Sequence, residues 1–366
     1  MTVVTKNRLE EGKKTAKDGK KICHYILTWL KVLLFTSCKF SPSPAIDSQE
    51  FNLAPETTVT LDSITLDFNF YPERWSLCDD TLWIINSRDS LFLTGFDIVS
   101  RDIVCSWGNI GGGPQDYISP GIVENSANKL LLYGNTENKV VGYHLCNGSL
   151  LESFRGKMPV WLSEHGLPKP YTRITSVNDS TFVGTYFLPR KVGADILNIN
   201  SGTLLNEIIL GIEQPKKNMS GPYEFKVSAS GSKLVFAYRY INRIEFLQIE
   251  PDYTSKIMYS YGNTDDQSDL YNADKDDDMI KYFSDIQCDS KYAYLLYHGV
   301  ETNKLEYSPT YLLIYDLDSY KNVANIRLDY YFDQLLVNNA GKIILSSPNH
   351  EDQIYVFQMN HDNLTL

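Results

Sequence analysis

One short pattern of apolar and polar positions returns six times along the chain, at a spacing close to 50 residues. Each copy has a polar turn followed by a run of apolar or aromatic residues, and a second run follows after another turn. The first runs are centred on Leu82, Leu130, Phe182, Leu234, Tyr294 and Ile343. Successive centres are 48, 52, 52, 60 and 49 residues apart. A repeat of this length predicts a radial or solenoid array of similar structural units.

The runs within each repeat have the length and composition of β-strands. They contain five to nine residues and are rich in Val, Ile, Leu, Tyr and Phe. Turn formers such as Asn147-Gly148 separate them, as in antiparallel meanders. Beyond residue 40 no apolar stretch keeps a helical period over three turns, which argues against a helical solenoid or a doubly wound sheet.

A less regular run precedes the first centre of most repeats, so that each repeat supplies about four strands. The predicted innermost strands span 118–124, 172–178, 224–230, 283–289 and 333–339. Six such units predict an all-β fold, a six-bladed antiparallel β-propeller over residues 56–366. The last blade lacks an outer strand, and we expect the alternating segment 56–68 to complete it and close the ring.

The first 38 residues differ from the rest of the chain. Basic side chains between Lys6 and Lys21 precede a short apolar stretch that ends at Cys38, and this order is typical of an export signal. Lys31 interrupts the stretch, which is short for a membrane-spanning helix. The end, Leu34 to Cys38, resembles a bacterial lipobox and implies that Cys38 carries a lipid. A cleaved secretory signal and a buried helix are the alternatives.

These features predict three parts: an export signal at 1–38, a flexible Ser/Pro-rich tether at 39–55 and the propeller at 56–366. The predicted protein is an exported outer-membrane or periplasmic lipoprotein. Its lipid anchor would be its only contact with the membrane, and we expect a monomer.

The charge of the predicted mature domain argues against nucleic acid as a partner. The chain has 34 basic and 45 acidic residues, of which eight and three lie in residues 1–38, so the remainder carries a net charge of −16. No basic stripe with interleaved aromatic residues offsets this charge. The cysteines Cys78, Cys105, Cys146 and Cys288 form no CxxC pair, and we expect free thiols rather than a disulfide framework.

The most specific local string is GNIGGGPQDY at 108–117, which lies at the junction between the first two repeats. Neither a Lys-Ser/Thr pair nor a helix follows it, so it is not a P-loop or a dinucleotide fingerprint. The string resembles the Gly-x-Gly-Pro-Gly-Glu-aromatic junction of the six-bladed NHL- or TolB-like propellers of exported Bacteroides-type lipoproteins. Gly111, Gly113, Pro114, Asp116 and Tyr117 carry the match, with Gln115 at a glycine position. Glycine and proline there suit a tight turn, and a loop on the ligand-binding face is the alternative.

An acidic stretch at 263–278 is a weak candidate for calcium. Asp274, Asp276 and Asp278 alternate as in a calcium loop, and Asp285 falls at the twelfth position. Met279 replaces the glycine of that motif, and the last ligand is not Glu. A solvated loop without a metal is therefore the favoured interpretation, and we expect no cofactor.

No motif for catalysis is present. The histidines are scattered over different repeats, with neither an HExxH zinc motif nor a Gly-x-Ser-x-Gly elbow. The 25 tyrosines, some expected on loops as at Tyr261, Tyr271 and Tyr307, favour recognition of a protein or glycan at the cell surface. We therefore predict a non-catalytic cell-envelope binding module. The alternative is a glycan-active enzyme, a hydrolase or lyase, which needs two carboxylates about 5–10 Å apart in the central funnel.

Overall fold

The computed structural model describes residues 50–68, 74–86, 90–113, 116–124, 129–159, 170–188, 191–212, 224–262, 279–338 and 340–359. All of them belong to the second of two compact units, Asp47–Leu366. The predicted lipid site Cys38 lies outside the described residues. These residues form an all-β fold with one short 3-10 helix, η3 (Thr302–Tyr307). No helix in this part of the chain is long and apolar enough to cross a membrane.

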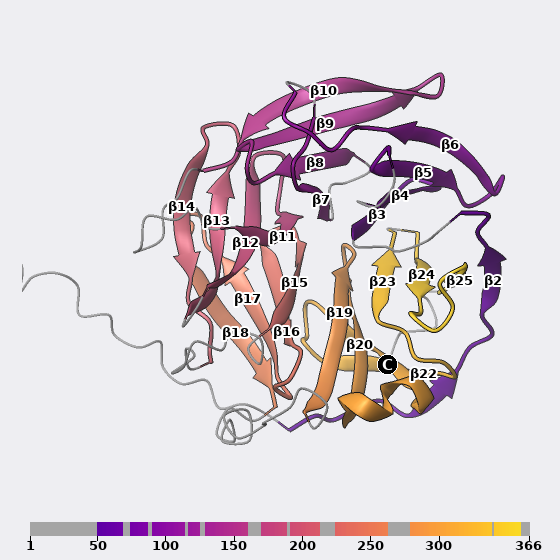
Figure 1. Cartoon of the computed structure of the whole chain (residues 1–366). Helices are drawn as coiled ribbons and strands as arrows, with labels where there is room; N and C mark the ends of the chain where they lie inside the picture. The colour runs from indigo at the N-terminus through magenta and orange to yellow at the C-terminus, as the bar shows by residue number, and fades with distance from the viewer. Residues whose placement is uncertain are drawn as a thin grey trace, which may run out of the picture. The chain divides into compact units, whose positions relative to one another are not determined.

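The strands form five sheets, three of which have four strands each (Figure 1). The first sheet contains β3 (Arg74–Cys78), β4 (Thr81–Ile85), β5 (Leu93–Asp97) and β6 (Asp102–Trp107). The second contains β15 (Phe225–Ser230), β16 (Lys233–Tyr238), β17 (Ile244–Ile249) and β18 (Ser255–Tyr261). The third has the order β2 (Asp62–Thr65), β25 (Gln353–Gln358), β24 (Lys342–Ser346) and β23 (Gln334–Val337).

The two remaining sheets are larger. A five-stranded sheet has the order β1 (Glu56–Thr58), β22 (Asn322–Leu328), β21 (Thr310–Asp316), β20 (Tyr292–Glu301) and β19 (Ile280–Cys288). An eight-stranded sheet has the order β10 (Ser149–Lys157), β9 (Lys139–Cys146), β8 (Leu130–Gly134), β7 (Pro120–Glu124), β11 (Tyr171–Ser176), β12 (Thr181–Leu188), β13 (Lys191–Asn198) and β14 (Thr203–Ile208). Its two antiparallel meanders are joined only by the parallel pairing of β7 with β11.

The first strands of successive meanders lie side by side around the middle of the fold. Contacts run from β3 to β7, β11, β15, β19 and β23 in turn, and from β23 back to β3. Figure 1 shows β7, β11, β15, β19 and β23 innermost, with their meanders extending outward. Each of these five strands overlaps one of the predicted innermost segments. The arrangement is propeller-like.

The segment 56–68 was predicted as one strand, and this is wrong. Its first part, β1, pairs in parallel with β22, whereas β2 pairs antiparallel with β25. Between these strands Val59 and Leu61 are partly buried against a core cluster formed by residues of both sheets. The segment divides because its residues pass from the outer edge of one sheet to the outer edge of the next, and each part pairs with the edge it meets.

The apolar core lies between neighbouring sheets. One cluster contains Ile64 and Leu66 of the N-terminal segment, Leu82 of the first sheet and Ile344 with Ile354 of the last. All five side chains are buried. The two ends of the described chain therefore share one core, which pairing and packing stabilise together.

Candidate functional site

The innermost strands surround two pockets, one toward each end of the strands. The larger, of about 690 Å³, is lined by residues at the carboxyl ends of these strands, including Ser76, Ser176 and Ser230, and we call it the serine-lined pocket. The smaller, of about 420 Å³, lies at the amino ends and is called the cationic pocket. Glu124 lines both pockets. Both lie in the space that the inner strands enclose, which we call the central channel.

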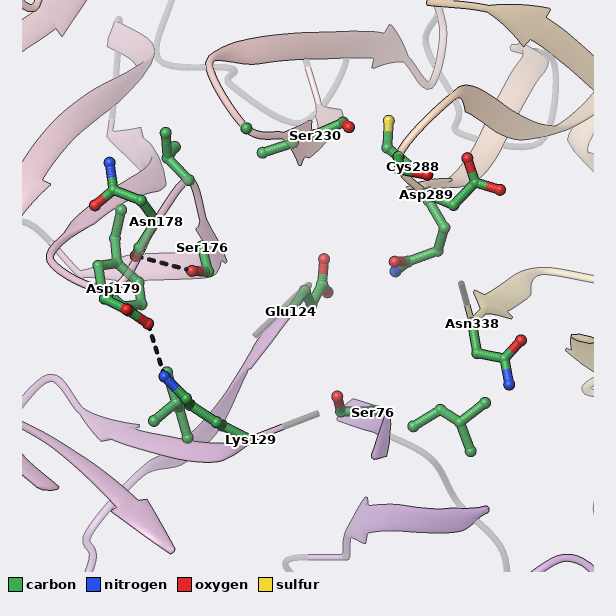
Figure 2. A pocket seen from close by; sticks show the side chains of 18 of the residues that line it. Ser76, Glu124, Lys129, Ser176, Asn178, Asp179, Ser230, Cys288, Asp289 and Asn338 are labelled. Carbon is green, nitrogen blue, oxygen red and sulfur yellow. Dashed lines mark hydrogen bonds and ion pairs between the residues drawn. The ribbon is translucent and has the colours of Figure 1, made fainter. Parts of the chain in front are cut away.

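Polar side chains at the rim of the serine-lined pocket fold the hairpins that follow the inner strands. In Asn178, Asp289 and Asn338, a side-chain oxygen accepts hydrogen bonds of 2.7–3.0 Å from backbone N–H groups two to four residues later. Such Asx turns are a local means of reversing the chain. Figure 2 shows these residues around the pocket, with Glu124 directed into its middle. The polar residues at the rim of the serine-lined pocket are therefore explained by their role in forming turns.

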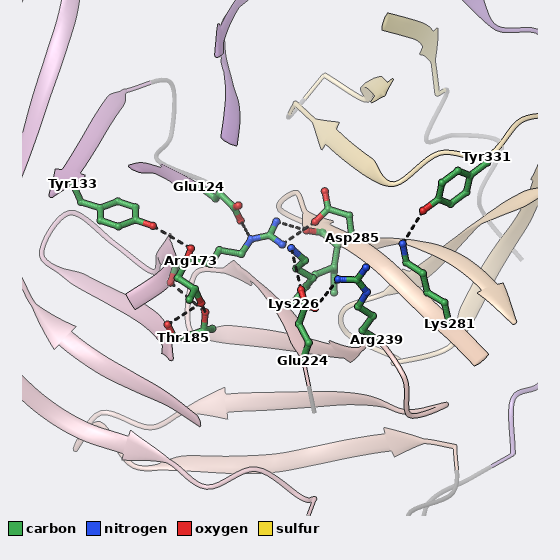
Figure 3. A network of polar contacts seen from close by, with 12 residues as sticks. Glu124, Tyr133, Arg173, Thr185, Glu224, Lys226, Arg239, Lys281, Asp285 and Tyr331 are labelled. Atoms are coloured by element: carbon green, nitrogen blue, oxygen red, sulfur yellow. Dashed lines mark hydrogen bonds and ion pairs between the residues drawn. The ribbon is translucent and has the colours of Figure 1, made fainter. Parts of the chain in front are cut away.

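Between the pockets lies a buried group of three charges, Arg173, Glu124 and Asp285, which we call the axial ion cluster (Figure 3). Arg173 Nε donates to Glu124 Oε2, and Arg173 Nη1 donates to Asp285 Oδ1 at 2.8 Å. The three side chains are only 11%, 15% and 7% exposed. One guanidinium thus pairs with two carboxylates at the middle of the channel.

Further contacts anchor the axial ion cluster to four inner strands. Arg173 of β11 reaches Glu124 of β7 and Asp285 of β19, and its Nη2 donates to the Ile286 carbonyl at 3.4 Å. Asp285 Oδ2 accepts the backbone N–H of Leu335 in β23 at 2.9 Å. Burial raises the pKa of Glu124, against the opposing effect of Arg173. Although burial acts in the other direction, the two carboxylates hold the pKa of Arg173 above its ordinary value.

Four further cations line the cationic pocket: Arg74 of β3, and Lys226, Arg239 and Lys281 on neighbouring elements. Arg239 Nη1 donates to Glu224 Oε2 at 2.6 Å, and Lys226 Nζ lies 4.0 Å from the other oxygen of the same carboxylate. Arg239 Nε is buried and has no hydrogen-bond partner among the described residues. Lys281 Nζ donates to the hydroxyl of Tyr331 at 2.8 Å. Figure 3 shows Lys226 and Arg239 directed toward the same space beside Asp285.

Lys281 is the most deeply buried of these cations, at 3% exposure. Burial and the neighbouring charge of Arg239 lower the pKa of Lys281 to about 8. Lys226 acts in the same direction, whereas the carboxylates Asp333 and Glu224 oppose the shift. The charged amine is therefore held in the folded state at a cost in free energy.

This cost predicts a pH dependence of stability. Between pH 8 and the unfolded pKa of lysine, the unfolded chain binds more protons at this site, so the free energy of unfolding should rise with pH. For Lys281 the rise from pH 7 to 9.5 should be about 2 kcal/mol, and Lys281→Met should remove it. Guanidinium titrations at both pH values measure this. Lys304→Met, at an exposed ion pair with Glu301, is the control, and an equal pH dependence in Lys281→Met and wild type would refute the assignment.

The predicted glycine-rich loop folds on itself in the structure. The Gly113 N–H donates to Asp116 Oδ2 at 2.9 Å, and the Gly111 N–H donates to the Tyr117 carbonyl at 3.1 Å. Tyr117 is fully buried, with Lys139 Nζ 3.7 Å from its ring centre. Pro114 lies outside the described residues. The other four residues line neither the serine-lined nor the cationic pocket, and a ligand-face role for this loop stays a prediction.

Most residues of the predicted calcium loop lie outside the described residues. Asp274, Asp276 and Asp278 are not among the described residues, and Asp285 contacts Arg173 and the Leu335 N–H. Within the described ranges no three His, Cys, Asp or Glu side chains are grouped so as to hold a metal ion. Calcium binding by the acidic stretch stays a prediction.

Two of the tyrosines predicted on loops are described. Tyr261 ends strand β18 and is buried, so its loop assignment is wrong, because the strand continues to the glycine that follows it. Tyr307 ends η3 and is 88% exposed. Tyr271 lies outside the described residues. All four described cysteines are free, and Cys146 alone among these four is exposed.

The charged residues of the channel were not predicted as a group, although Asp285 was considered as a calcium ligand. Glu124, Arg173, Lys226 and Asp285 all lie within segments that were predicted as innermost strands. An ionisable residue in an innermost strand either faces the channel or is buried in the core, where it needs a partner. Charge within those segments is therefore the signal that identifies the site.

No model of a protein family matches this chain, and no curated protein matches it. Solved structures are similar to it at low identity. A Bacteroides fragilis protein described as exported is 11% identical, with a TM-score of 0.49 over 86% of this chain and 99% of that one. Kluyveromyces lactis Hsv2 is 10% identical, with a TM-score of 0.43 over 79% and 75% of the two chains. Regucalcin of Agrobacterium tumefaciens, a calcium-binding protein, is 10% identical, with a TM-score of 0.45 over 83% and 95%.

Proposed function

We propose that this protein is an exported, lipid-anchored six-bladed β-propeller that acts as a non-catalytic binding module of the cell envelope. Six blades follow if the eight-stranded sheet is counted as two meanders joined through β7 and β11. The unbroken series of contacts between the six inner strands supports this count. The pairing of β2 with β25 supports closure by the N-terminal segment. The NHL- or TolB-like type rests on the junction motif alone.

The proposed location at the cell envelope rests on the sequence before the propeller. Basic residues, an apolar stretch and a small-residue ending precede Cys38, and a strongly acidic strand-rich domain follows. A lipid on Cys38 would hold that domain at a membrane without a spanning helix. The acidic surface disfavours nucleic acid, so the proposed partner is a protein or glycan at the cell surface.

Replacing Cys38 by Ser tests the proposed attachment to the membrane. The variant should fold normally but lack lipid, and it should move from the membrane fraction to the soluble fraction because one lipid-bearing residue is the proposed anchor. Fractionation of cells expressing either form measures the shift. Wild-type protein in the soluble fraction, or a Ser variant that stays equally membrane-bound, contradicts the proposal.

The axial ion cluster is the observation that carries the non-catalytic assignment. Glycan hydrolysis needs one carboxyl group to donate a proton and a second to act as base or nucleophile. Glu124 and Asp285 do meet in the channel, but both are paired with Arg173, and Asp285 also accepts a backbone N–H. Pairing with Arg173 favours the ionised form of Glu124 and so opposes proton donation by it, although burial acts in the other direction. The pair therefore serves to join strands rather than to cleave a substrate.

The glycan-active alternative has one observation in its favour: two carboxylates converge in a pocket, and burial raises the pKa of Glu124. An enzyme that used Glu124 would lose about 10²–10⁴-fold in rate in Glu124→Gln. We expect no release of reducing ends from polygalacturonate or dextran by either wild type or Glu124→Gln. Release by wild type that the substitution abolishes would establish the enzyme instead.

A further inference from the structure

The cationic pocket has an electrostatic character opposite to that of the domain around it. Five cationic side chains line it, Arg74, Arg173, Lys226, Arg239 and Lys281. Four acidic side chains line it as well, Glu124, Glu224, Asp285 and Asp333. One positive charge therefore remains in a domain whose net charge is −16. Low-dielectric walls focus such a field into the pocket.

Ion pairs are distributed unevenly around the pocket, and Arg74 donates to the Tyr133 hydroxyl. Arg173 is saturated by Glu124 and Asp285. The carboxylate of Glu224, in contrast, is shared by two cations. Arg239 lies 2.6 Å from it and Lys226 lies 4.0 Å from it. Two cations thus share one carboxylate, and the described residues provide Lys281 with a tyrosine hydroxyl rather than an ion pair.

Arg239 supplies an independent observation. Its Nε–H is buried and has no acceptor among the described residues, while its side chain lines the pocket. A buried donor without an acceptor is destabilising unless something satisfies it. An anionic group in the pocket beside Lys226 and the Arg239 guanidinium would compensate the excess charge. Mutual repulsion among the cations, which contributes to the lowered pKa values of Lys226 and Lys281, would also decrease.

We propose that the cationic pocket binds the carboxylate of an acidic sugar, with Arg239 and Lys226 as its main ligands. A singly charged carboxylate matches the single excess charge better than a dianionic phosphate does. Thr172, Gln287 and Gln334 add hydroxyl and amide groups to the wall, which suit the hydroxyls of a sugar. The volume of about 420 Å³ is within the range of small-molecule sites. This inference rests on the proposed binding function and names its ligand class.

Isothermal titration calorimetry of the full-length protein in detergent tests the site, with D-galacturonate, D-galactose and D-galactose 6-phosphate as probes. We expect 1:1 binding of galacturonate, with galactose at least about tenfold weaker because it lacks the charge. Arg239→Gln and Lys226→Gln should each weaken galacturonate about tenfold or more. Lys304→Gln, which removes an exposed cation paired with Glu301, should leave its affinity unchanged.

Several results overturn the proposal. Galactose that binds as tightly as galacturonate would contradict recognition of a single charge, and so would galactose 6-phosphate that binds tenfold tighter than galacturonate. Equal affinity of wild type and Lys226→Gln for galacturonate also overturns the proposal. The Lys226 side chain is 33% exposed, so we expect this variant to fold. Absence of galacturonate binding refutes the site but leaves the envelope function in place, whereas cleavage of a glycan refutes that function whichever sugar binds.

Discussion

Replacing Arg173 by Met should lower the free energy of unfolding by about 3–5 kcal/mol, because it leaves two buried carboxylates without their cation. Arg173 joins Glu124 of β7 to Asp285 of β19 across the channel. Denaturant titration at pH 7 measures the loss. The matched control is Lys129→Met, which breaks an ion pair with Asp179 whose side chains are 58% and 90% exposed. That change should cost less than about 1 kcal/mol.

The loss of stability in Arg173→Met should also depend on pH. Arg173 lowers the pKa of Glu124 against the larger effect of burial, so without Arg173 this pKa should rise further and the folded variant should bind a proton that the unfolded chain releases. Its loss of stability relative to wild type should therefore be largest at neutral pH and shrink as the pH falls toward 5. A loss that equals the Lys129→Met control, or one that does not change with pH, would mean that the axial ion cluster does not hold the inner strands together.

Removing the N-terminal segment should have a comparable or larger effect. Deletion of 56–68 removes β1 and β2, exposes the edge of β25 and takes Ile64 and Leu66 out of a shared core. An open strand edge also favours aggregation. We expect a protein that is destabilised by several kcal/mol, at about 1 kcal/mol for each lost hydrogen bond plus the lost apolar burial, and that is prone to associate.

A single substitution gives the cleaner form of this test. Ile64→Ala removes a buried side chain from the cluster between the first and last sheets and should cost about 2–4 kcal/mol. Ser63→Ala changes the exposed neighbour on the opposite face of β2, and should stay within about 0.5 kcal/mol of wild type. Thermal melting of both variants compares them. Equal melting temperatures would show that the segment does not stabilise the fold.

The all-β, propeller-like arrangement was predictable because strand formation leaves a local signal in the sequence. Alternation and turn residues located the inner strands, as in the overlap of predicted 224–230 with Phe225–Ser230. The division of 56–68 between two sheets was not predictable, since both halves alternate alike. Each strand pairs with the sheet edge that lies nearby in the fold. The strands that pair with β1 and β2 are about 270 and 290 residues away along the chain.

The channel chemistry was harder to predict for a similar reason. Arg173 is 49 residues from Glu124 and 112 from Asp285, so no motif spacing brings the three together. The glycine-rich string, in contrast, was conspicuous in sequence, and in the described residues its contacts are largely internal or with neighbouring core residues. A charged residue within a predicted innermost strand is therefore a better guide to the channel than a local motif.

Native mass spectrometry of the wild-type protein with tetragalacturonate detects both binding and cleavage of an acidic glycan in one spectrum. For a non-catalytic binder we expect a 1:1 complex whose added mass is that of the intact tetrasaccharide, unchanged after prolonged incubation. Complexes with shorter fragments would contradict the non-catalytic assignment, and the absence of any complex would contradict binding of acidic sugars in the central channel.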